Sequence, residues 1–335
     1  MGRTRLMAVD LPPFGFGGAS VGNLYRASSD EEAHDALAAS LEVGFTYWDT
    51  APRYGHGLSE QRIGAFLRDY SGPRPTLSTK VGRLLTPAGP EGPQYHGFAD
   101  PLPFDQVFDY SYDGILRSFD ESCARLGVEA VDVLYMHDIG RVTHLEDHDA
   151  QFRIAMDGGY RAMERLKAEG RVKAIGLGVN EWEVCVETFP HARFDVFMIA
   201  GRYTLLEQGA LDVLMPACEA RGVAIVSAGP LNSGLLASRP DASSHYDYHE
   251  VPPDILLRAQ TLHDFCADHH VPLQAAALRF PLLHPSVVSV VGGMASRARV
   301  LQAAEWLAVD IPASFWRELK DAGLLREDAP TGAAS

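Results

Sequence analysis

Short runs rich in Val, Ile, Leu and aromatic residues recur along the 335-residue chain, and each precedes a longer stretch in which apolar residues return at helical spacing. This alternation constrains the fold more than any other feature of the sequence. The predicted strands are Phe14–Gly17, Thr46–Asp49, Thr76–Lys80, Val131–His137, Val172–Gly178, Asp195–Ile199, Val223–Ser227 and Val287–Val291. The predicted helices are Asp30–Val43, Ser59–Arg68, Tyr110–Leu126, Gly159–Glu169, Glu181–Thr188, Ala210–Ala220, Ile255–Asp268 and Arg297–Leu307. Because each apolar parallel strand needs its own crossover helix, the pattern predicts an α/β fold, a closed (β/α)8 TIM barrel.

An open doubly wound sheet is the alternative architecture, and it requires a glycine-rich phosphate turn after its first strand. The segment from Gly15 to Ser20 has Ser at the third glycine position of the G-x-G-x-x-G pattern, and the segment from Gly176 to Glu181 has Glu there. Both segments are therefore interpreted as turns at the ends of strands.

The chain carries no Gly/Ser linker or low-complexity run, so we expect a single domain over residues 1–335. Three predicted connections are long, namely 82–104, 138–158 and 228–254, and each follows a strand. They would therefore emerge at the C-terminal face of the barrel, where long loops usually carry function.

Charge and composition argue against several classes of protein. Lys and Arg total 29 against 44 Asp and Glu, and the formal net charge of −15 disfavours binding of nucleic acid through phosphate contacts. The four scattered cysteines form no C-x-x-C pair, and there is no apolar run of signal-peptide or membrane-spanning length. We therefore expect a cytoplasmic protein that lacks a disulfide framework and a membrane segment. These features leave the oligomeric state open.

Two histidines have the i,i+4 spacing of helical metal ligands. His144 and His148 flank Glu146 and Asp147, but the segment is polar and lacks the H-E-x-x-H order. We interpret it as a solvated loop and predict no metal site.

Charged or titratable side chains end three neighbouring predicted strands. Asp49 ends the second strand, Lys80 the third and His137 the fourth, and Tyr54 lies in a glycine-bracketed turn five residues after Asp49. The C-terminal ends of barrel strands meet at one mouth. The sequence therefore predicts that these four side chains converge.

Such a cluster has a definite acid/base chemistry. A tyrosine with its ordinary pKa of about 10 is a poor base at neutral pH, but a nearby lysine cation favours the phenolate and a carboxylate keeps that lysine charged. His137 would orient a substrate oxygen and share in its proton transfer. Proton transfer at a carbonyl or carbinol oxygen needs a partner for the electrons, so we expect a nicotinamide cofactor beside the cluster.

The motifs that contain these residues are similar to those of a known family. They are Asp49-Thr50-Ala51 with Tyr54-Gly55 and Ser59-Glu60, then Ser78-Thr79-Lys80, then Leu134-Tyr135-Met136-His137. Together they resemble the aldo-keto reductase superfamily, and the resemblance extends from about Phe14 to about Leu307. It implies a (β/α)8 barrel and NAD(P)-dependent oxidoreduction. It also implies that Tyr54 is the general acid/base, that Lys80 and Asp49 tune it, and that His137 orients the substrate.

Segments 22–26, 137–138, 176–182 and 201–206 resemble one branch of this superfamily, the D-threo-aldose (L-fucose) 1-dehydrogenases and pyridoxal 4-dehydrogenases. This resemblance implies oxidation of the ring carbinol of a cyclic hemiacetal, such as L-fucose, D-arabinose or pyridoxal, to a lactone. Tyr54 would then act as a phenolate base. Tyr25 would form a wall of the substrate pocket, and Asp138 would bind a neighbouring substrate hydroxyl.

The resemblance also implies cofactor contacts, of which Asn180, Tyr203 and Ser227 form one group. Asn180 matches the carboxamide-binding Asn of the family after a one-residue insertion, and Ala228 stands where the family has an aromatic that stacks on nicotinamide. The second group resembles the adenosine-phosphate segment, where a helix N-terminus suits phosphate, and comprises Gly293, Ser296, Arg297 and Arg299. The two arginines either pair with a 2′-phosphate, which favours NADP, or are solvated, so NAD and NADP both stay open.

Three other functions fit parts of the pattern. The first is an NADPH-dependent aldehyde or ketone reductase on the same scaffold, which runs the reaction toward the alcohol. The second is a nicotinamide-binding redox sensor, against which the intact set of four candidate catalytic residues argues. The third is a metal-dependent barrel lyase, which would lose activity with a chelator.

Overall fold

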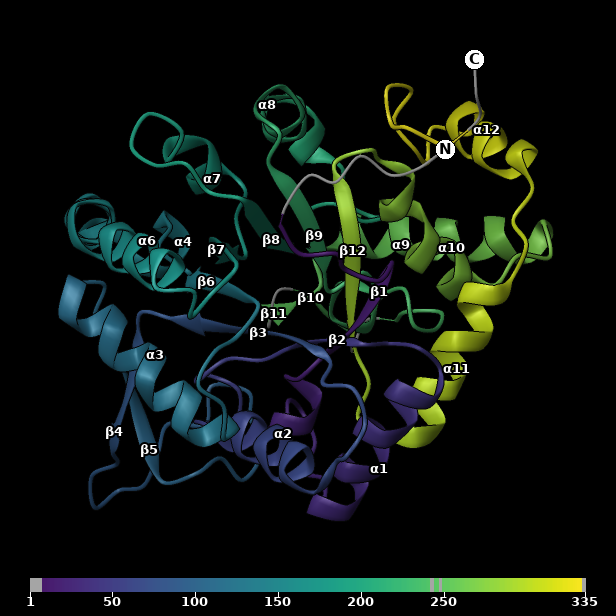
Figure 1. The fold of residues 1–335 in the computed structure, drawn as a ribbon. Helices are drawn as coiled ribbons and strands as arrows, with labels where there is room; N and C mark the ends of the chain where they lie inside the picture. Colours follow the sequence, from purple (N-terminus) through teal and green to yellow (C-terminus); the bar gives the residue numbers. More distant parts are fainter. Residues whose placement is uncertain (1–7, 242–243, 247–248, 333–335) are drawn as a thin grey trace.

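The computed structural model describes residues 8–241, 244–246 and 249–332. Eight parallel strands of this part close into a barrel in the order β1-β12-β9-β8-β7-β6-β3-β2 (Figure 1). These strands are β1 (Phe14–Gly17), β2 (Tyr47–Asp49), β3 (Thr76–Val81), β6 (Val133–His137), β7 (Ala174–Val179), β8 (Val196–Ala200), β9 (Ala224–Ala228) and β12 (Val287–Gly293). The predicted (β/α)8 barrel is confirmed.

Helices surround the barrel (Figure 1). They are α1 (Asp30–Glu42), α2 (Leu58–Asp69), α3 (Tyr112–Leu126), α4 (Arg141–His144), α5 (His148–Ile154), α6 (Tyr160–Ala168), α7 (Glu183–Glu187), α8 (Leu214–Arg221), α9 (Pro253–Asp268), α10 (Leu273–Arg279), α11 (Arg297–Ala308) and α12 (Ala313–Asp321). Short helical turns of other pitch occur at Ser20–Gly22, Leu145–Asp147, Ala155–Gly159, Gly209–Leu211, Asn232–Gly234 and Phe280–Leu283. No helix within the described ranges is long and apolar enough to cross a membrane.

Every predicted barrel strand is present, and the three long connections contain structure of their own. The antiparallel hairpin of β4 (Arg83–Pro87) and β5 (Phe104–Phe108) follows β3, helices α4 and α5 follow β6, and the short pair β10 (His245–Tyr246) and β11 (His249–Glu250) follows β9. Helices α10 and α12 are also additional to the prediction. Helix α10 is almost entirely apolar and shows no amphipathic period, and α12 lies beyond the eighth strand-helix unit.

Local sequence sets where these helices begin and end. Ser29 caps α1, accepting from the backbone N–H of Glu32 while the Glu32 side chain accepts from the Ser29 N–H. Helices α3 and α8 each end at a glycine with positive φ, Gly127 at 67° and Gly222 at 67°. Each end directs the chain back toward the next barrel strand.

Side chains alternate between the inside and the outside of the barrel along each strand. Tyr47 and Tyr135 point inward and join the cluster that fills the barrel. Their neighbours Trp48 and Leu134 pack outward against the helices, and the Trp48 indole donates to the Ser40 hydroxyl of α1 over 2.9 Å. A residue two positions after an inward-facing tyrosine points in the same direction. Asp49, two after Tyr47, and His137, two after Tyr135, therefore point into the mouth of the barrel.

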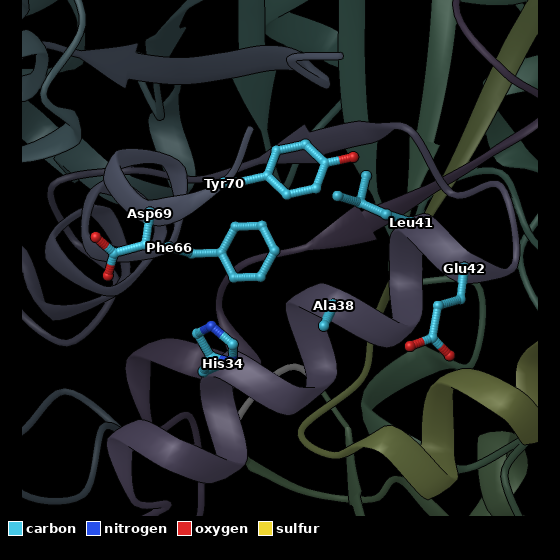
Figure 2. Close-up of a pocket in the computed structure, with 7 residues that line it drawn as sticks. All are labelled: His34, Ala38, Leu41, Glu42, Phe66, Asp69 and Tyr70. Carbon is cyan, nitrogen blue, oxygen red and sulfur yellow. The ribbon is translucent and has the colours of Figure 1, made fainter. Parts of the chain in front are cut away.

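A groove of about 520 Å³ lies on the outside of the barrel, between α1 and α2. Figure 2 shows the His34 imidazole beside the Phe66 ring in this groove, and their ring centroids are 4.9 Å apart. The lining residues are His34, Ala38, Leu41, Glu42, Phe66, Asp69 and Tyr70. They belong to the helical layer, so the groove is separate from the mouth of the barrel.

Candidate active site

The four predicted catalytic side chains meet at the C-terminal mouth of the barrel, where Lys80 is the central donor. Its ammonium donates to Asp49 Oδ2 over 2.6 Å, to the backbone oxygen of Thr50 over 3.0 Å and to Tyr54 Oη over 3.0 Å. Asp49 and Lys80 are both only 2% exposed. Burial lowers the pKa of Lys80, but the charges of Asp49 and Tyr54 outweigh this effect and raise the pKa above its ordinary value.

A polar layer lies below this ion pair inside the barrel. Ser78 Oγ donates to the second oxygen of Asp49 over 2.7 Å. The Tyr47 hydroxyl lies 2.9 Å from Ser78 Oγ and 3.2 Å from the Tyr135 hydroxyl. Both oxygens of Asp49 therefore have buried donors, which meets the requirement for placing a carboxylate in the core.

The turn that presents Tyr54 is fixed by close packing. Gly55 has a φ of 62°, and a side chain there would collide with the backbone oxygen of Gly22. The Ser59 N–H donates to the Tyr54 backbone oxygen over 3.1 Å, and Ser59 Oγ donates to the Gly18 oxygen over 2.8 Å. The bond to Tyr54 holds α2 against this turn, and the bond to Gly18 ties it to the segment after β1.

Glu60 has a structural role in this turn. It is fully buried and accepts from Thr79 Oγ1 and from Arg125 Nε, each over 2.6 Å. These bonds join α2 to β3 and α3 on the outer side of the barrel. The Ser59-Glu60 motif therefore supports the cluster without touching it.

His137 faces the cluster from the end of β6. Its ring is perpendicular to that of Tyr54, with the centroids 6.2 Å apart, and the side chain is 6% exposed. Nδ1 is buried and has no hydrogen-bond partner among the described residues. Burial holds the pKa of His137 well below its ordinary value, and the charges of Arg83, Lys80 and Arg53 add to this while Asp138 opposes it. The imidazole is therefore neutral at neutral pH.

Asp138 is buried next to His137, with protein partners at both oxygens. Oδ2 accepts from Arg83 over 2.6 Å, and Oδ1 accepts from Asn180 Nδ2 over 3.1 Å. Burial alone would raise the pKa of Asp138, but His137 and Arg83 hold it below its ordinary value. Both oxygens of the carboxylate thus have protein donors, and the predicted contact with a substrate hydroxyl stays a prediction.

Arg83 is a site residue that the sequence analysis missed. It is the first residue of β4, is 6% exposed and stacks over the Phe108 ring at 4.4 Å. One sequence signal could have identified it. Arg83 lies two residues after the end of β3, at the mouth, where Gly82 turns the chain with a φ of 96°. Its carboxylate partner is 55 residues away in the sequence, and no local pattern predicts that pair.

The connection between β4 and β5 contacts both Tyr25 and Tyr54. Tyr25 is 57% exposed and its N–H donates to the Gly97 oxygen over 2.9 Å. The Phe98 ring lies 6.1 Å from the Tyr54 ring, centroid to centroid. Tyr25 is therefore linked to the Tyr54 region through Gly97 and Phe98, and its role as a pocket wall stays a prediction.

The first group of predicted cofactor residues is divided by the structure. Asn180 lies at the mouth, where its backbone oxygen accepts from Arg202 Nε. Tyr203 is fully buried in the outer core, with its ring 5.2 Å from Phe280. Ser227 is also fully buried, and its hydroxyl donates to the Tyr203 backbone oxygen over 2.8 Å. The structure does not bring the Tyr203 ring or the Ser227 hydroxyl to the mouth.

The second group lies at the end of β12 and the start of α11. Gly293 is exposed next to Ser20, and Ser296 caps α11. The Arg297 guanidinium binds both carboxylate oxygens of Glu42 on α1, one of them over 2.9 Å, and Arg299 donates to Gln302 over 2.9 Å. The first turn of α11 contains no acidic residue. An exposed, capped helix start of this kind suits a phosphate.

The two histidines with metal-ligand spacing have other partners. His144 Nε2 lies 3.0 Å from the Tyr110 hydroxyl, and His148 Nε2 lies 3.0 Å from a Glu187 oxygen. Across residues 8–241, 244–246 and 249–332, no group of three or more His, Cys, Asp or Glu side chains is arranged to hold a metal ion.

Known proteins are similar to this chain in sequence and in fold. Residues 13–323 match the aldo/keto reductase family. The chain is 42% identical to pyridoxal 4-dehydrogenase of Microbacterium luteolum, over 97% of each chain. It is also 42% identical to D-threo-aldose 1-dehydrogenase of a Pseudomonas species, over 94% of this chain and 95% of that protein.

Among solved structures, an aldo-keto reductase of Bacillus halodurans in its holo form superposes with a TM-score of 0.73 at 22% identity, covering 98% of this chain and 96% of its own. The resemblance predicted from the motifs around Asp49, Tyr54, Lys80 and His137 is confirmed at the level of the family and of the branch. The chain belongs to the aldo/keto reductase family of oxidoreductases.

Proposed function

We propose that this protein is an NAD(P)-dependent dehydrogenase that oxidises the ring carbinol of a cyclic hemiacetal, an aldose or a pyridoxal-like compound, to the lactone. The observation that carries the proposal is the triple contact of Lys80, whose ammonium joins Asp49, Thr50 and Tyr54 at the mouth of the barrel. Relatives that are 42% identical over nearly the whole chain are named for the oxidation of pyridoxal and of D-threo-aldoses.

In this proposal Tyr54 accepts the proton of the anomeric hydroxyl. The Lys80 ammonium, 3.0 Å from Tyr54 Oη, favours the phenolate form by direct electrostatic attraction. Asp49 holds the ammonium in place, and Ser78, which is itself hydrogen-bonded to Tyr47, holds Asp49 from below. The base is therefore preorganised before the substrate arrives.

His137 orients the substrate oxygen in this scheme. A neutral imidazole donates one hydrogen bond and accepts another, and the lowered pKa of His137 keeps it in that form. Its ring stands edge-on to the Tyr54 ring. One substrate oxygen bound to both groups would have its position and its proton controlled from two sides.

The described residues at the mouth fit a nicotinamide dinucleotide. The exposed start of α11, capped by Ser296 and without acidic residues, suits its phosphates, with Gly293, Arg297 and Arg299 beside it. Asn180, which lies next to Asp138, would bind the carboxamide. When bound, the cofactor supplies the two-electron acceptor for the carbinol. The buried positions of Tyr203 and Ser227 favour roles for these two residues in supporting the barrel wall.

Absorbance at the reduced-nicotinamide band tests the proposal. Purified protein would be mixed with L-fucose, D-arabinose, L-xylose or pyridoxal, each with NAD⁺ and with NADP⁺. We expect a rise with at least one hemiacetal, and mass spectrometry of the product should show the loss of two hydrogens that forms the lactone.

Two other results would overturn the proposal in different ways. Faster reduction of simple aldehydes than oxidation of any hemiacetal would identify an aldehyde or ketone reductase. Cofactor binding with no turnover in either direction would identify a nicotinamide-binding redox sensor. Treatment with a chelator is the control for a metal-dependent barrel lyase, and we expect it to leave turnover unchanged.

A further inference from the structure

The Asp138 carboxylate contacts two residues that have different roles in the proposed site, His137 and Asn180. Oδ2 is 3.5 Å from Nε2 of His137, the residue proposed to orient the substrate, and Oδ1 accepts from Asn180, the residue proposed to bind the carboxamide of the cofactor. Asp138 is 5% exposed. A single buried carboxylate thus contacts one group from each half of the site.

We propose that Asp138 is a positioning residue that fixes the hydrogen of His137 on Nε2 and holds the Asn180 amide, with Arg83 as the counter-ion that keeps its carboxylate in place. The inference rests on the proposed function, because it gives His137 and Asn180 their substrate and cofactor roles. Asp138 acts through these two residues, which is a different role from binding a substrate hydroxyl.

The backbone around Asp138 is built to hold this position. Asp138 has a φ of 52°, in the left-handed region that Asp and Asn tolerate better than most residues. Its N–H donates to the Gly178 oxygen over 3.0 Å. The buried Tyr110 hydroxyl lies 2.8 Å from the His137 backbone oxygen and 3.1 Å from that of Asp138. Both peptide groups are therefore tied to the same tyrosine.

Arg83 accounts for the stability of the buried charge. Its guanidinium donates to Asp138 Oδ2 over 2.6 Å and stacks on Phe108. A buried carboxylate is costly unless it is paired and hydrogen-bonded, and Asp138 has both an ion pair and an amide donor. Residues of three elements thus hold the Asp138 carboxylate and its ion pair in place, namely Arg83 on β4, Phe108 on β5 and Asn180 in the turn after β7.

The carboxylate also determines which nitrogen of His137 carries the hydrogen. A negative oxygen 3.5 Å from Nε2 favours the Nε2–H tautomer by electrostatic attraction. Nδ1 then carries the lone pair, in a buried position without a donor among the described residues. The other charged or titratable groups that face His137 are Arg83, Lys80, Arg53 and Tyr54. Asp138 supplies the negative charge nearest the ring.

Asparagine cannot replace this carboxylate. Arg83 and Asn180 both donate hydrogen bonds to Asp138, one to each oxygen. An amide has one oxygen and one NH₂ group, so in an Asp138→Asn variant one of the two donors would face another donor. The same substitution keeps the size of the side chain and tolerates the positive φ.

The kinetic test compares Asp138→Asn with Asp132→Asn. Asp132 is a matched control, because it is 4% exposed, binds Arg74 and Lys173, and lies at the opposite end of the same barrel segment. For Asp138→Asn we expect kcat to fall by about 10-fold to 100-fold and the equilibrium Kd of NAD⁺ or NADP⁺ to rise. For Asp132→Asn we expect a lower Tm with unchanged kcat.

The pattern across substrates separates positioning from direct contact. Positioning predicts the same fractional loss of kcat for L-fucose, D-arabinose and pyridoxal. A loss that appears as a higher KM and only for substrates with one particular hydroxyl would overturn the inference in favour of direct substrate binding. An unchanged kcat and cofactor Kd would also overturn it.

A measurement on the resting protein keeps the inference testable apart from the proposed function. Protein labelled with ¹⁵N at histidine reports the tautomer of His137 through its ring nitrogen shifts, with the signal assigned by a His137→Gln variant. We expect Nε2–H in the native protein and a shift toward Nδ1–H in Asp138→Asn. Unchanged shifts would refute the tautomer role, even in a protein that oxidises no sugar.

A double variant addresses loss of folding. Asp138→Asn leaves Arg83 as an uncompensated buried charge, which destabilises the fold. Asp138→Asn combined with Arg83→Met removes that charge, and we expect Tm to recover while kcat stays low. Recovery of kcat together with Tm would show that Asp138 matters for folding alone.

Discussion

At the residue scale, the proposed site depends on how buried charges are compensated. Lys80 donates to three acceptors and is 2% exposed. Its raised pKa, caused by Asp49 and Tyr54 against the opposing effect of burial, keeps it protonated throughout the physiological range. A permanent cation beside Tyr54 Oη is the condition for using a tyrosine as a base near neutral pH.

Replacing Tyr54 with Phe removes the proposed base and leaves Lys80 with its bonds to Asp49 and Thr50. We expect kcat to fall by about 100-fold or more while cofactor binding is unchanged. Initial rates and a fluorescence titration with cofactor measure the two quantities. Turnover close to that of the native protein would contradict the assignment of Tyr54.

His284 provides a prediction on stability. Burial lowers its pKa from 6.5 to about 4, and its Nδ1 accepts from the Ser286 N–H over 3.1 Å. The folded state keeps this imidazole neutral where the unfolded chain binds a proton, so its contribution to stability is complete above pH 6.5 and is lost as the pH falls toward 4.

We therefore expect a His284→Gln variant to lose about 2–3 kcal/mol less unfolding free energy than the native protein between pH 7 and pH 4. Urea unfolding at several pH values measures the two curves. Parallel curves for the variant and the native protein would show that His284 does not titrate in this way.

The sequence predicted the residues that strand ends bring together, and it failed where the partner is distant. Asp49, Lys80 and His137 end neighbouring barrel strands, so barrel geometry alone places them at one mouth. Tyr203 lies three residues past β8, where strand parity no longer determines direction, and it turned into the outer core. The pairing of Arg83 with Asp138 depends on how the β4–β5 hairpin packs, which local spacing does not encode.

At the element scale, the helices were predictable where their amphipathic period is strong. Helix α3 shows a clear period and a Ser111 cap, and the structure has it over Tyr112–Leu126. The connection between β4 and β5 is held by bonds to distant backbone groups, with the Ala99 N–H donating to the Asn23 oxygen and the Leu102 N–H to the Gly55 oxygen. Such contacts join segments that are far apart in the sequence, so the path of this connection could not be derived from local pattern.

The contact between α1 and α11 gives a prediction on cofactor choice. Glu42 holds the Arg297 guanidinium at the proposed phosphate end of the cofactor. A Glu42→Gln variant releases this arginine, and we expect the Kd of NADP⁺ to fall by about 3-fold to 10-fold relative to that of NAD⁺ at low salt, because a free guanidinium pairs well with a 2′-phosphate.

Glu31→Gln is the matched control, since Glu31 lies on the same helix in its first turn. Fluorescence titrations at low and high salt measure the two Kd values for each variant. If the Kd values of NAD⁺ and NADP⁺ change equally in Glu42→Gln, the Glu42–Arg297 ion pair has no part in the choice between the two cofactors.

At the scale of the whole molecule, the eight-fold alternation of strands and helices, together with the lack of a glycine-rich phosphate turn after the first strand, was sufficient to predict a closed barrel. The identity of the substrate was beyond this reasoning. We expect specificity to lie in the long connections at the mouth, and these share no repeating pattern from which a shape follows.

The barrel also buries all four cysteines, and burial raises the pKa of Cys123 to about 11 and those of Cys218 and Cys266 to about 12. Cys185 is raised well above its ordinary pKa for the same reason. We expect Ellman's reagent to react slowly with the native protein and to titrate four thiols in urea. A thiol that reacts rapidly in the native protein would contradict the burial of these side chains.

The hydrogen bonds inside the barrel have one direction. Ser78 donates its only hydroxyl hydrogen to Asp49. The Ser78 oxygen therefore accepts from the Tyr47 hydroxyl, and the Tyr47 oxygen accepts from the Tyr135 hydroxyl. Together with Lys80 on the other side of Asp49, these hydroxyls form a row of aligned dipoles whose positive, hydrogen-bearing ends all point toward one carboxylate. The Asp49 carboxylate thereby sets the orientation of each hydroxyl hydrogen beneath it, so the end of the barrel that carries the proposed site also orders the polar groups along its axis.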